Sequence, residues 1–257
     1  SETSFALVNS DDKNAGVMCQ NSRARKYTFA LNSVADFKGV IMENSLEGIA
    51  LKINNIELLS KLIGKFNAYN LLAVFGVGTL LGIDQLQLLT GISNLDSVNG
   101  RFQFFKSNKG VTVVVDYAHT PDALQNVLNT IQHLIAGGKI ITVVGCGGDR
   151  DRDKRPEMAK IAQRASHQVI LTSDNPRSED PQKIIQEMME GIDPKIPVPI
   201  ISIQDRKHAI QTASLLAQQS DIVLIAGKGH EAYQEILGVR YDFNDFEIAF
   251  ELFNQNY

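Results

Sequence analysis

Apolar and polar residues follow two different patterns along the chain, and the pattern changes near residue 100. In the first part, short alternating runs are separated by turn residues such as Asn32-Ser33 and Asn54-Asn55. This alternation predicts strands at Ser4–Asn9, Lys26–Leu31, Phe37–Glu43 and Gly48–Asn54. The short breaks between them predict an antiparallel β-meander, followed by helices at about Phe66–Leu81 and Asp84–Gly91.

The second part alternates near-continuous apolar runs with amphipathic helices, which is typical of a parallel sheet covered on both faces. A helix is expected over Pro121–Ile135, and Thr120-Pro121 and Asp180-Pro181 are helix-start signals. The expected strands are Val111–Val115, Lys139–Val144, Gln168–Thr172, Pro199–Ile203 and Asp221–Ala226. We therefore predict an α/β chain whose second domain is doubly wound and Rossmann-like. The polar stretch Ser93–Asn99 marks the boundary, so the predicted domains are residues 1–98 and 99–257.

The composition excludes several classes of protein. With 44% hydrophobic residues the chain can bury a core, and its net charge of −4 gives no overall attraction to nucleic acid or anionic membranes. The uncharged stretch Phe66–Ile83 is interrupted by Asn67 and Asn70, so we interpret it as a buried helix rather than a membrane span. Residues 1–15 show no signal-peptide pattern, and Cys19 and Cys146 fit neither a metal site nor a disulfide framework. These features predict a cytoplasmic protein without membrane insertion.

The candidate chemistry lies in the loops that follow the five predicted parallel strands, because ligands bind at that edge of such sheets. The loops are DYAHTPD (116–122), GCGGDRDRDKRP (145–156), SDNPRSEDP (173–181), QDRKH (204–208) and GKGHE (227–231). All five are polar and four carry arginine or lysine, although any single loop could be polar only for solubility. We interpret the set as one ligand site.

The second of these loops has features of an anion site. The glycines of Gly145–Gly148 could let backbone N–H groups approach an anion, although a tight turn explains them equally well. A local cationic cluster follows, made of Arg150, Arg152, Lys154 and Arg155. The alternative is a solvated charge run in which these cations have Asp149, Asp151 and Asp153 as partners. We expect this solvated arrangement at least for Arg152.

The segment Asp174-Asn175-Pro176-Arg177 is more specific, because proline fixes the loop and arginine can bind a carboxylate through two parallel hydrogen bonds. Glu231 could hold an ammonium group, so the two loops together predict an amino-acid site. His119 and His230 are expected to be structural or positioning groups, since no nucleophile accompanies them. The sequence has no zinc-ligand spacing and no G-x-x-x-x-G-K-[ST] phosphate loop, so we assign no catalytic residue and no metal ligand.

These segments, together with FNAYN (66–70), GR (100–101), DYAHTPDAL (116–124) and AGKGHE (226–231), resemble the Mur ligases over essentially the whole chain. Within that family they are similar to the UDP-N-acetylmuramoyl-tripeptide synthetases, which add the third residue of the peptidoglycan stem peptide. The resemblance implies that residues 1–98 are the carboxyl-terminal part of a central ATPase domain and residues 99–257 an amino-acid-binding domain. The family's phosphate loop, carbamoylated lysine and magnesium ligands would lie upstream, so we expect a fragment that is inactive alone.

The family's reaction is an ATP-dependent amide ligation through an acyl phosphate, so the resemblance implies ATP and Mg²⁺ as cofactors. The implied partners are UDP-N-acetylmuramoyl-L-alanyl-D-glutamate and meso-diaminopimelate, because the Asn-Pro-Arg loop is associated with diaminopimelate rather than lysine. The residues implied to bind ATP are Asn70, Arg101, Asp116 and His119. Those implied to bind the incoming amino acid are Arg150, Asp174, Asn175, Pro176, Arg177, Gly227 and Glu231. We expect a monomer and no nucleic-acid partner.

Three alternatives stay open. A lysine-adding Mur ligase would catalyse the same type of ligation with a different amino acid. A folylpolyglutamate synthetase would share the two-domain layout but should lack the DNPR and GKGHE segments. A non-catalytic Rossmann-like nucleotide-binding module would use Gly145–Gly148 but would leave Arg177 and Glu231 unexplained.

Overall fold

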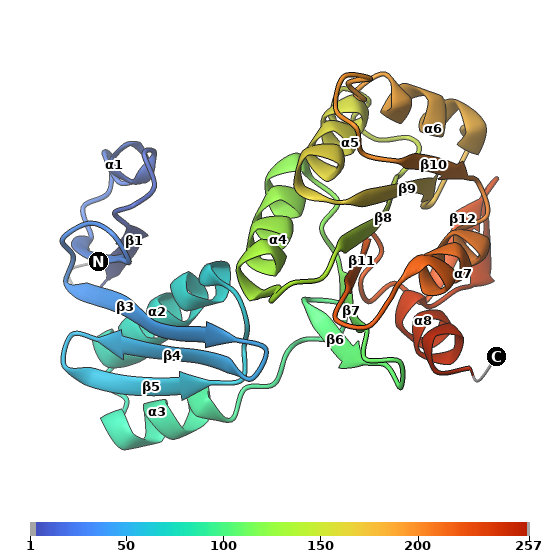
Figure 1. Ribbon diagram of the computed structural model, residues 1–257. Helices are drawn as coiled ribbons and strands as arrows, with labels where there is room; N and C mark the ends of the chain where they lie inside the picture. The colour runs from blue at the N-terminus through green and yellow to red at the C-terminus, as the bar shows by residue number, and fades with distance from the viewer. Residues whose placement is uncertain (1–3, 256–257) are drawn as a thin grey trace. The chain divides into compact units, whose positions relative to one another are not determined.

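The chain divides between Ser97 and Val98 into two units, each with its own sheet and apolar core, in the computed structural model (Figure 1). The structure describes residues 4–255. The first unit has a five-stranded sheet in the order β1-β2-β3-β4-β5. Its strands are β1 (Phe5–Asn9), β2 (Arg25–Ala30), β3 (Phe37–Ser45), β4 (Gly48–Ile53) and β5 (Ile56–Ser60). Its helices are α1 (Ala15–Met18), α2 (Lys65–Leu80) and α3 (Gln85–Ser93).

The mixed α/β class is confirmed, but the predicted antiparallel meander is correct only for the second half of this sheet. Strands β3, β4 and β5 are antiparallel, whereas β1–β2 and β2–β3 are parallel. Residues 10–24, which include α1, return the chain after β1, so β2 runs in the same direction. Strands β2 and β3 pair only at Phe29–Phe37 and Ala30–Lys38, and this short overlap allows a parallel pair with a short connection. Strand β5 is missing from the prediction.

Helix α2 covers the sheet of the first unit, as the sequence predicts for the uncharged stretch. Leu71, Leu72 and Phe75 are buried in one cluster with Ile49 and Leu51 of β4. Burial of such side chains stabilises the unit by roughly 1.5–3 kcal/mol each. No helix within residues 4–255 is both long enough and apolar enough to cross a membrane.

The second unit has a six-stranded sheet in the order β10-β9-β8-β11-β7-β6, and β6 is its antiparallel edge. Its strands are β6 (Gln103–Lys106), β7 (Thr112–Asp116), β8 (Ile140–Cys146), β9 (Gln168–Ser173), β10 (Ile200–Ile203) and β11 (Ile222–Ala226). A separate hairpin consists of β12 (Tyr233–Ile236) and β13 (Val239–Asp242). All five predicted strands are present, and they are mutually parallel. Strands β6, β12 and β13 are missing from the prediction.

Helices cover both faces of this sheet, which confirms the doubly wound fold (Figure 1). They are α4 (Pro121–Leu134), α5 (Lys154–Ala165), α6 (Pro181–Met189), α7 (Arg206–Leu216) and α8 (Asp245–Asn254). Helices α7 and α8 pack on one face, while α4, α5 and α6 lie side by side on the other. The predicted start signals are confirmed, because Thr120 and Asp180 accept hydrogen bonds from the N–H groups of Ala123 and Gln182.

Candidate functional site

All five polar loops leave neighbouring strands, because β10, β9, β8, β11 and β7 are adjacent in the sheet. The loops after β8 and β9 contact each other directly. The N–H of Gly148 donates to the carbonyl of Asn175 at 2.9 Å, and Nη1 of Arg177 donates to the carbonyl of Gly148 at 2.8 Å. A Cβ atom on Gly148 would lie 2.0 Å from the carbonyl oxygen of Pro176. Close loop packing therefore explains this glycine, and its N–H is used by a backbone carbonyl, which favours the tight-turn alternative at this position.

The fifth loop, QDRKH, sends one side chain, that of Arg206, into the core, while Asp205, Lys207 and His208 are exposed. Asp205 caps α7, and the side chain of Arg206 is completely buried. Nε and Nη2 of Arg206 donate to the two carboxylate oxygens of Asp245 at 2.8 and 2.7 Å. Nη2 also donates to the carbonyl of Ala226 at 3.0 Å. Its inclusion in one ligand site is therefore wrong for Arg206, whose charge is matched inside the protein.

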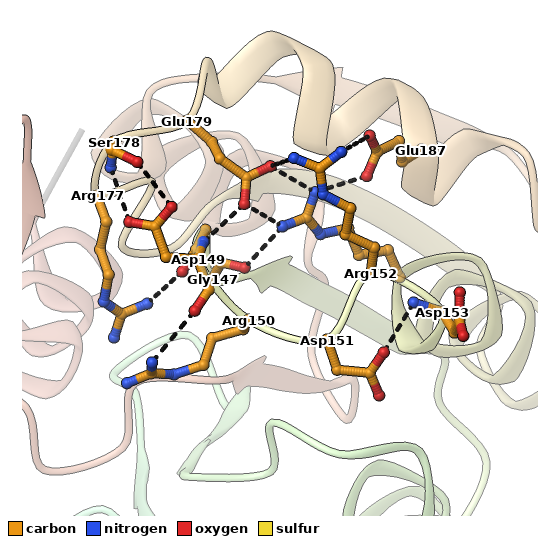
Figure 2. A network of polar contacts seen from close by, with 12 residues as sticks. Gly147, Asp149, Arg150, Asp151, Arg152, Asp153, Arg177, Ser178, Glu179 and Glu187 are labelled. Atoms are coloured by element: carbon orange, nitrogen blue, oxygen red, sulfur yellow. Dashed lines mark hydrogen bonds and ion pairs between the residues drawn. The ribbon is translucent and has the colours of Figure 1, made fainter.

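The cationic cluster after Gly148 is largely paired with α6 and the segment before it (Figure 2). The completely buried guanidinium of Arg155 donates to both oxygens of Glu179, at 2.8 and 3.0 Å, and to Glu187. Arg152, whose side chain is 56% exposed, also lies 3.0 Å from Glu179. The hydrogen bonds from Arg155 lower the pKa of Glu179 to about 2.

Arg152 is exposed, as expected for a solvated charge run, but its ion-pair partners are Glu179 and Glu187 rather than the neighbouring aspartates. Asp149 accepts hydrogen bonds from the N–H and hydroxyl of Ser178, and Asp151 accepts one from the N–H of Asp153. These contacts and the Glu179 contacts join the loop after β8 to the segment that follows Arg177 (Figure 2).

Arg150 and Arg177 flank Gly147. A Cβ atom on that glycine would lie 2.9 Å from Nη1 of Arg177 and 3.7 Å from Cγ of Arg150. Arg150 is exposed, and its Nη1 lies 3.2 Å from the carbonyl of Asp149. Arg177 is half-buried and has a left-handed backbone with φ of 51°, a conformation that non-glycine residues rarely adopt. No described ion pair joins Arg177 to Glu179 or Asp180 within residues 4–255.

Asn175 links Arg177's loop to the loop after β11. Its Nδ2 donates to Oε2 of Glu231 at 2.7 Å, while its Oδ1 accepts from Nζ of Lys228 at 3.0 Å and from the N–H of Glu235 at 3.0 Å. Nζ of the buried Lys228 also lies 3.2 Å from Oε2 of Glu231. Glu231, the predicted ammonium acceptor, therefore already binds an ammonium group of the protein through one oxygen.

The shape of this loop depends on three residues that pack within or against it: Asp174, Pro176 and Gly227. Asp174 and Pro176 are buried, and Oδ1 of Asp174 accepts the N–H of Asn175 at 2.6 Å. Burial raises the pKa of Asp174, and Arg206 and Lys228 oppose that rise. Gly227 has φ of 120°, and a Cβ there would lie 2.5 Å from Oδ2 of Asp174. These three residues shape the loop, whereas Arg150 and Arg177 present charge beside it.

Three of the four residues implied to bind nucleotide lie together at the end of β7. The guanidinium of Arg101 lies 4.6 Å from the centre of the Tyr117 ring, and His119 packs against the same ring. Asp116 is buried and accepts the N–H of Phe102 at 2.7 Å; burial raises its pKa, which that hydrogen bond opposes. Asn70 belongs to the first unit, where it is exposed on α2 and donates to Asn67 at 3.1 Å.

The buried ion pairs near the site loops were not predicted from the sequence. Glu179, Lys228 and the pair Arg206–Asp245 were not singled out, although each holds a site loop or the strand ends beneath it. One signal was available for Arg206: it is the first residue of a helix, where the helix dipole disfavours a cation that has no acidic partner. No group of three or more His, Cys, Asp and Glu side chains is arranged to hold a metal ion in the part of the chain that the structure describes.

Comparison with known proteins identifies two domains of one family. The glutamate ligase domain of the Mur ligases matches residues 100–229, and the Mur ligase middle domain matches residues 1–78. A UDP-N-acetylmuramoyl-L-alanyl-D-glutamate–2,6-diaminopimelate ligase of Bacteroides thetaiotaomicron is 55% identical over 98% of this chain and 53% of its own length. The enzyme of that name from Bacillus velezensis is 41% identical over 95% of this chain and 50% of its own length.

Two solved structures are also similar to this chain, one in sequence and fold and one in fold alone. A structure titled UDP-N-acetylmuramoyl-L-alanyl-D-glutamate–2,6-diaminopimelate ligase is 38% identical and has a TM-score of 0.64 over 97% of this chain and 53% of its own. A folylpolyglutamate synthase of Thermotoga maritima shares the fold, with 18% identity and a TM-score of 0.62 over 86% of this chain and 50% of its own. The chain spans about half the length of the curated relatives it matches. By its two matched domains and its fold, the chain belongs to the Mur ligase family.

Proposed function

We propose that this chain takes part in an ATP-dependent ligation that joins meso-diaminopimelate to UDP-N-acetylmuramoyl-L-alanyl-D-glutamate. The observation that carries the proposal is the 52–55% identity to three relatives named for this reaction, over 98% of the chain. This range of the chain includes every site loop described above. The second unit would be the amino-acid-binding domain, and the first unit would be part of the ATPase domain.

The loop geometry supports an amino-acid site with two charged ends. Nη1 of Arg177 donates to a backbone carbonyl, and the other guanidinium N–H groups are suited to a carboxylate. Glu231 is held through Oε2 by Asn175 and Lys228, which leaves Oε1 to accept an ammonium group. Diaminopimelate carries a carboxylate and an ammonium group at the end where lysine carries only an ammonium group. Arg177 would therefore favour diaminopimelate over lysine, and Arg150 would add a second cation beside it.

The residues at the end of β7 partly fit a nucleotide. Arg101 is held on the Tyr117 ring with an exposed cationic edge, which suits a phosphate, and His119 lies on the same ring. Asp116 would fix the backbone at Phe102 rather than bind nucleotide directly, because its carboxylate accepts that N–H. ATP, when bound, would supply the phosphoryl group that activates the acceptor carboxylate. The described residues offer no cluster of His, Cys, Asp and Glu side chains that could hold Mg²⁺.

The test is a ligation assay with the intact protein that contains this sequence. Purified protein is incubated with ATP, UDP-N-acetylmuramoyl-L-alanyl-D-glutamate and either meso-diaminopimelate, L-lysine or L-glutamate, and products are identified by mass spectrometry. We expect a product with diaminopimelate. A product with lysine alone would identify a lysine-adding enzyme. In a parallel reaction with a folate in place of the nucleotide substrate, glutamate addition would identify the folylpolyglutamate alternative. ATP hydrolysis without any amide product would contradict the proposal.

A further inference from the structure

Arg155 and Glu179 form a largely enclosed charged contact beside the proposed amino-acid loops. The side chain of Arg155 is completely buried, and that of Glu179 is 11% exposed. Both oxygens of Glu179 accept hydrogen bonds from Arg155, in the bidentate arrangement that gives such pairs a fixed geometry. Nη2 of Arg155 also donates to the carbonyl of Gly147 at 3.2 Å. Arg155 thus holds the glycine loop and Glu179 simultaneously.

Glu179 also connects Arg155, through Asp149, to the segment that carries Arg177. Its Oε1 accepts the N–H of Asp149 at 2.6 Å, and Asp149 in turn binds Ser178 through its carboxylate (Figure 2). Asp149 and Arg177 both have left-handed backbones, with φ of 52° and 51°. Such conformations persist only where surrounding contacts fix them. Glu179 fixes the backbone of Asp149 directly, whereas the backbone of Arg177 is also held by hydrogen bonds to Glu235 and Leu237.

The charges explain why the arginine is needed. Glu179 and Glu187 both face Arg155, which lies between them, and without its guanidinium the two carboxylates would repel each other. Glu179 would then turn toward solvent and release the N–H of Asp149. Arg152 contacts the same two carboxylates, but it is 56% exposed and its contact with Glu187 is 3.9 Å long. It could not replace the buried pair, because exposed ion pairs are weak and screened.

We propose that Arg155, acting through Glu179, is a positioning residue that sets the orientation of Arg177 and thereby the selection of the distal carboxylate of the amino-acid substrate. Arg155 itself touches no substrate, because its side chain is completely enclosed. The proposal rests on the proposed function, in which Arg177 binds that carboxylate. It adds a residue outside the binding loop to the determinants of specificity.

The first test compares Arg155→Lys, Glu179→Gln and the matched control Arg152→Ala in the intact protein. Arg155→Lys keeps the charge but loses the bidentate contact, and Glu179→Gln keeps the shape. We expect each to raise KM for meso-diaminopimelate about ten- to a hundred-fold, as displacements of about 1 Å can do, with kcat and KM for the nucleotide substrate within about twofold. Arg152→Ala should leave all three constants within about twofold. If Arg155→Lys fails to fold, Glu179→Gln carries the test.

A double-mutant cycle separates positioning from general damage. If Arg155 acts through Arg177, then Arg155→Lys should cost little further affinity in an Arg177→Ala background, whereas independent effects would multiply. The inference would be overturned if the fold-losses of affinity multiplied in the double variant. It would also be overturned if a single variant lowered kcat and raised KM for all substrates by the same factor. If the wild-type protein does not ligate diaminopimelate, the proposed function fails; if it does and Arg155→Lys and Glu179→Gln keep the wild-type KM, only this inference fails.

Discussion

Lys228 and Glu231 form an ion pair of 3.2 Å inside the loop after β11, and the lysine is completely buried. Asn175 joins them, since its amide oxygen accepts from Lys228 and its amide nitrogen donates to Glu231. The pair orients Glu231 through one oxygen before any ligand binds. A carboxylate that is held in this way is preorganised for an ammonium group on its other oxygen.

Replacing Lys228 by methionine should destabilise the second unit. The variant leaves Asn175 and Glu231 without their charged donor in a buried setting, which costs about 1–3 kcal/mol. The free energy of unfolding of the chain, measured by urea denaturation, should fall by that amount. Lys207→Met, on the exposed face of α7, is the matched control and should change it by less than about 0.5 kcal/mol. Equal stability of the two variants would show that the Lys228 contacts contribute nothing.

Glu179 should make the protein sensitive to acid. Hydrogen bonds from Arg155 hold its pKa at about 2, below the usual value of 4.5, so the folded state prefers the ionised form. This contribution to stability is complete above pH 4.5 and is lost as the pH falls from 4.5 toward about 2. Melting temperatures measured across that range should fall less steeply for Glu179→Gln than for wild type. Glu157→Gln, at an exposed position of α5, should follow the wild-type curve, and parallel curves for all three proteins would contradict the account.

Gly148 should not tolerate a methyl group. An alanine Cβ would lie 2.0 Å from the carbonyl oxygen of Pro176, so the Asn175–Arg177 loop must move. We expect Gly148→Ala in the intact protein to raise KM for diaminopimelate at least about ten-fold. Gly91→Ala is the control, because nothing lies within 4 Å of the added Cβ in α3, and it should be neutral or stabilise by up to about 1 kcal/mol. A wild-type KM for Gly148→Ala would show that the two loops do not need their close approach.

The second unit was easier to predict from sequence than the first. Buried parallel strands such as Val223–Ile225 are apolar on both faces, so each is visible as a continuous run whatever its neighbours are. In the first unit, strand direction depends on which strands pair. The parallel contact of Phe29 with Phe37 and the antiparallel contacts of β4 arise from similar alternating runs, and only the three-dimensional path distinguishes them.

In the site as well, motifs of adjacent residues could be predicted from the sequence, whereas contacts between residues far apart in the chain could not. The DNPR and GKGHE segments are visible in the sequence because proline, glycine and charged residues occur together. Their partners are not, since Arg155 and Glu179 are 24 residues apart and Arg206 and Asp245 are 39 residues apart. Arg152 and Arg155 belong to the same charged run, yet one is exposed and the other is completely buried. Burial follows from how α5 and α6 pack, which residue spacing alone does not reveal.

We propose that Arg177 binds the second carboxylate of meso-diaminopimelate, and a comparison of two amino-acid substrates distinguishes this role from general damage to the site. KM for meso-diaminopimelate and for L-lysine is determined for the intact wild-type protein and for Arg177→Ala. Charge-assisted hydrogen bonds contribute roughly 1.5–3 kcal/mol each, so the variant should bind diaminopimelate about ten- to several-hundred-fold more weakly, with little change for lysine. Equal losses for both amino acids, or no loss for diaminopimelate, would contradict the account.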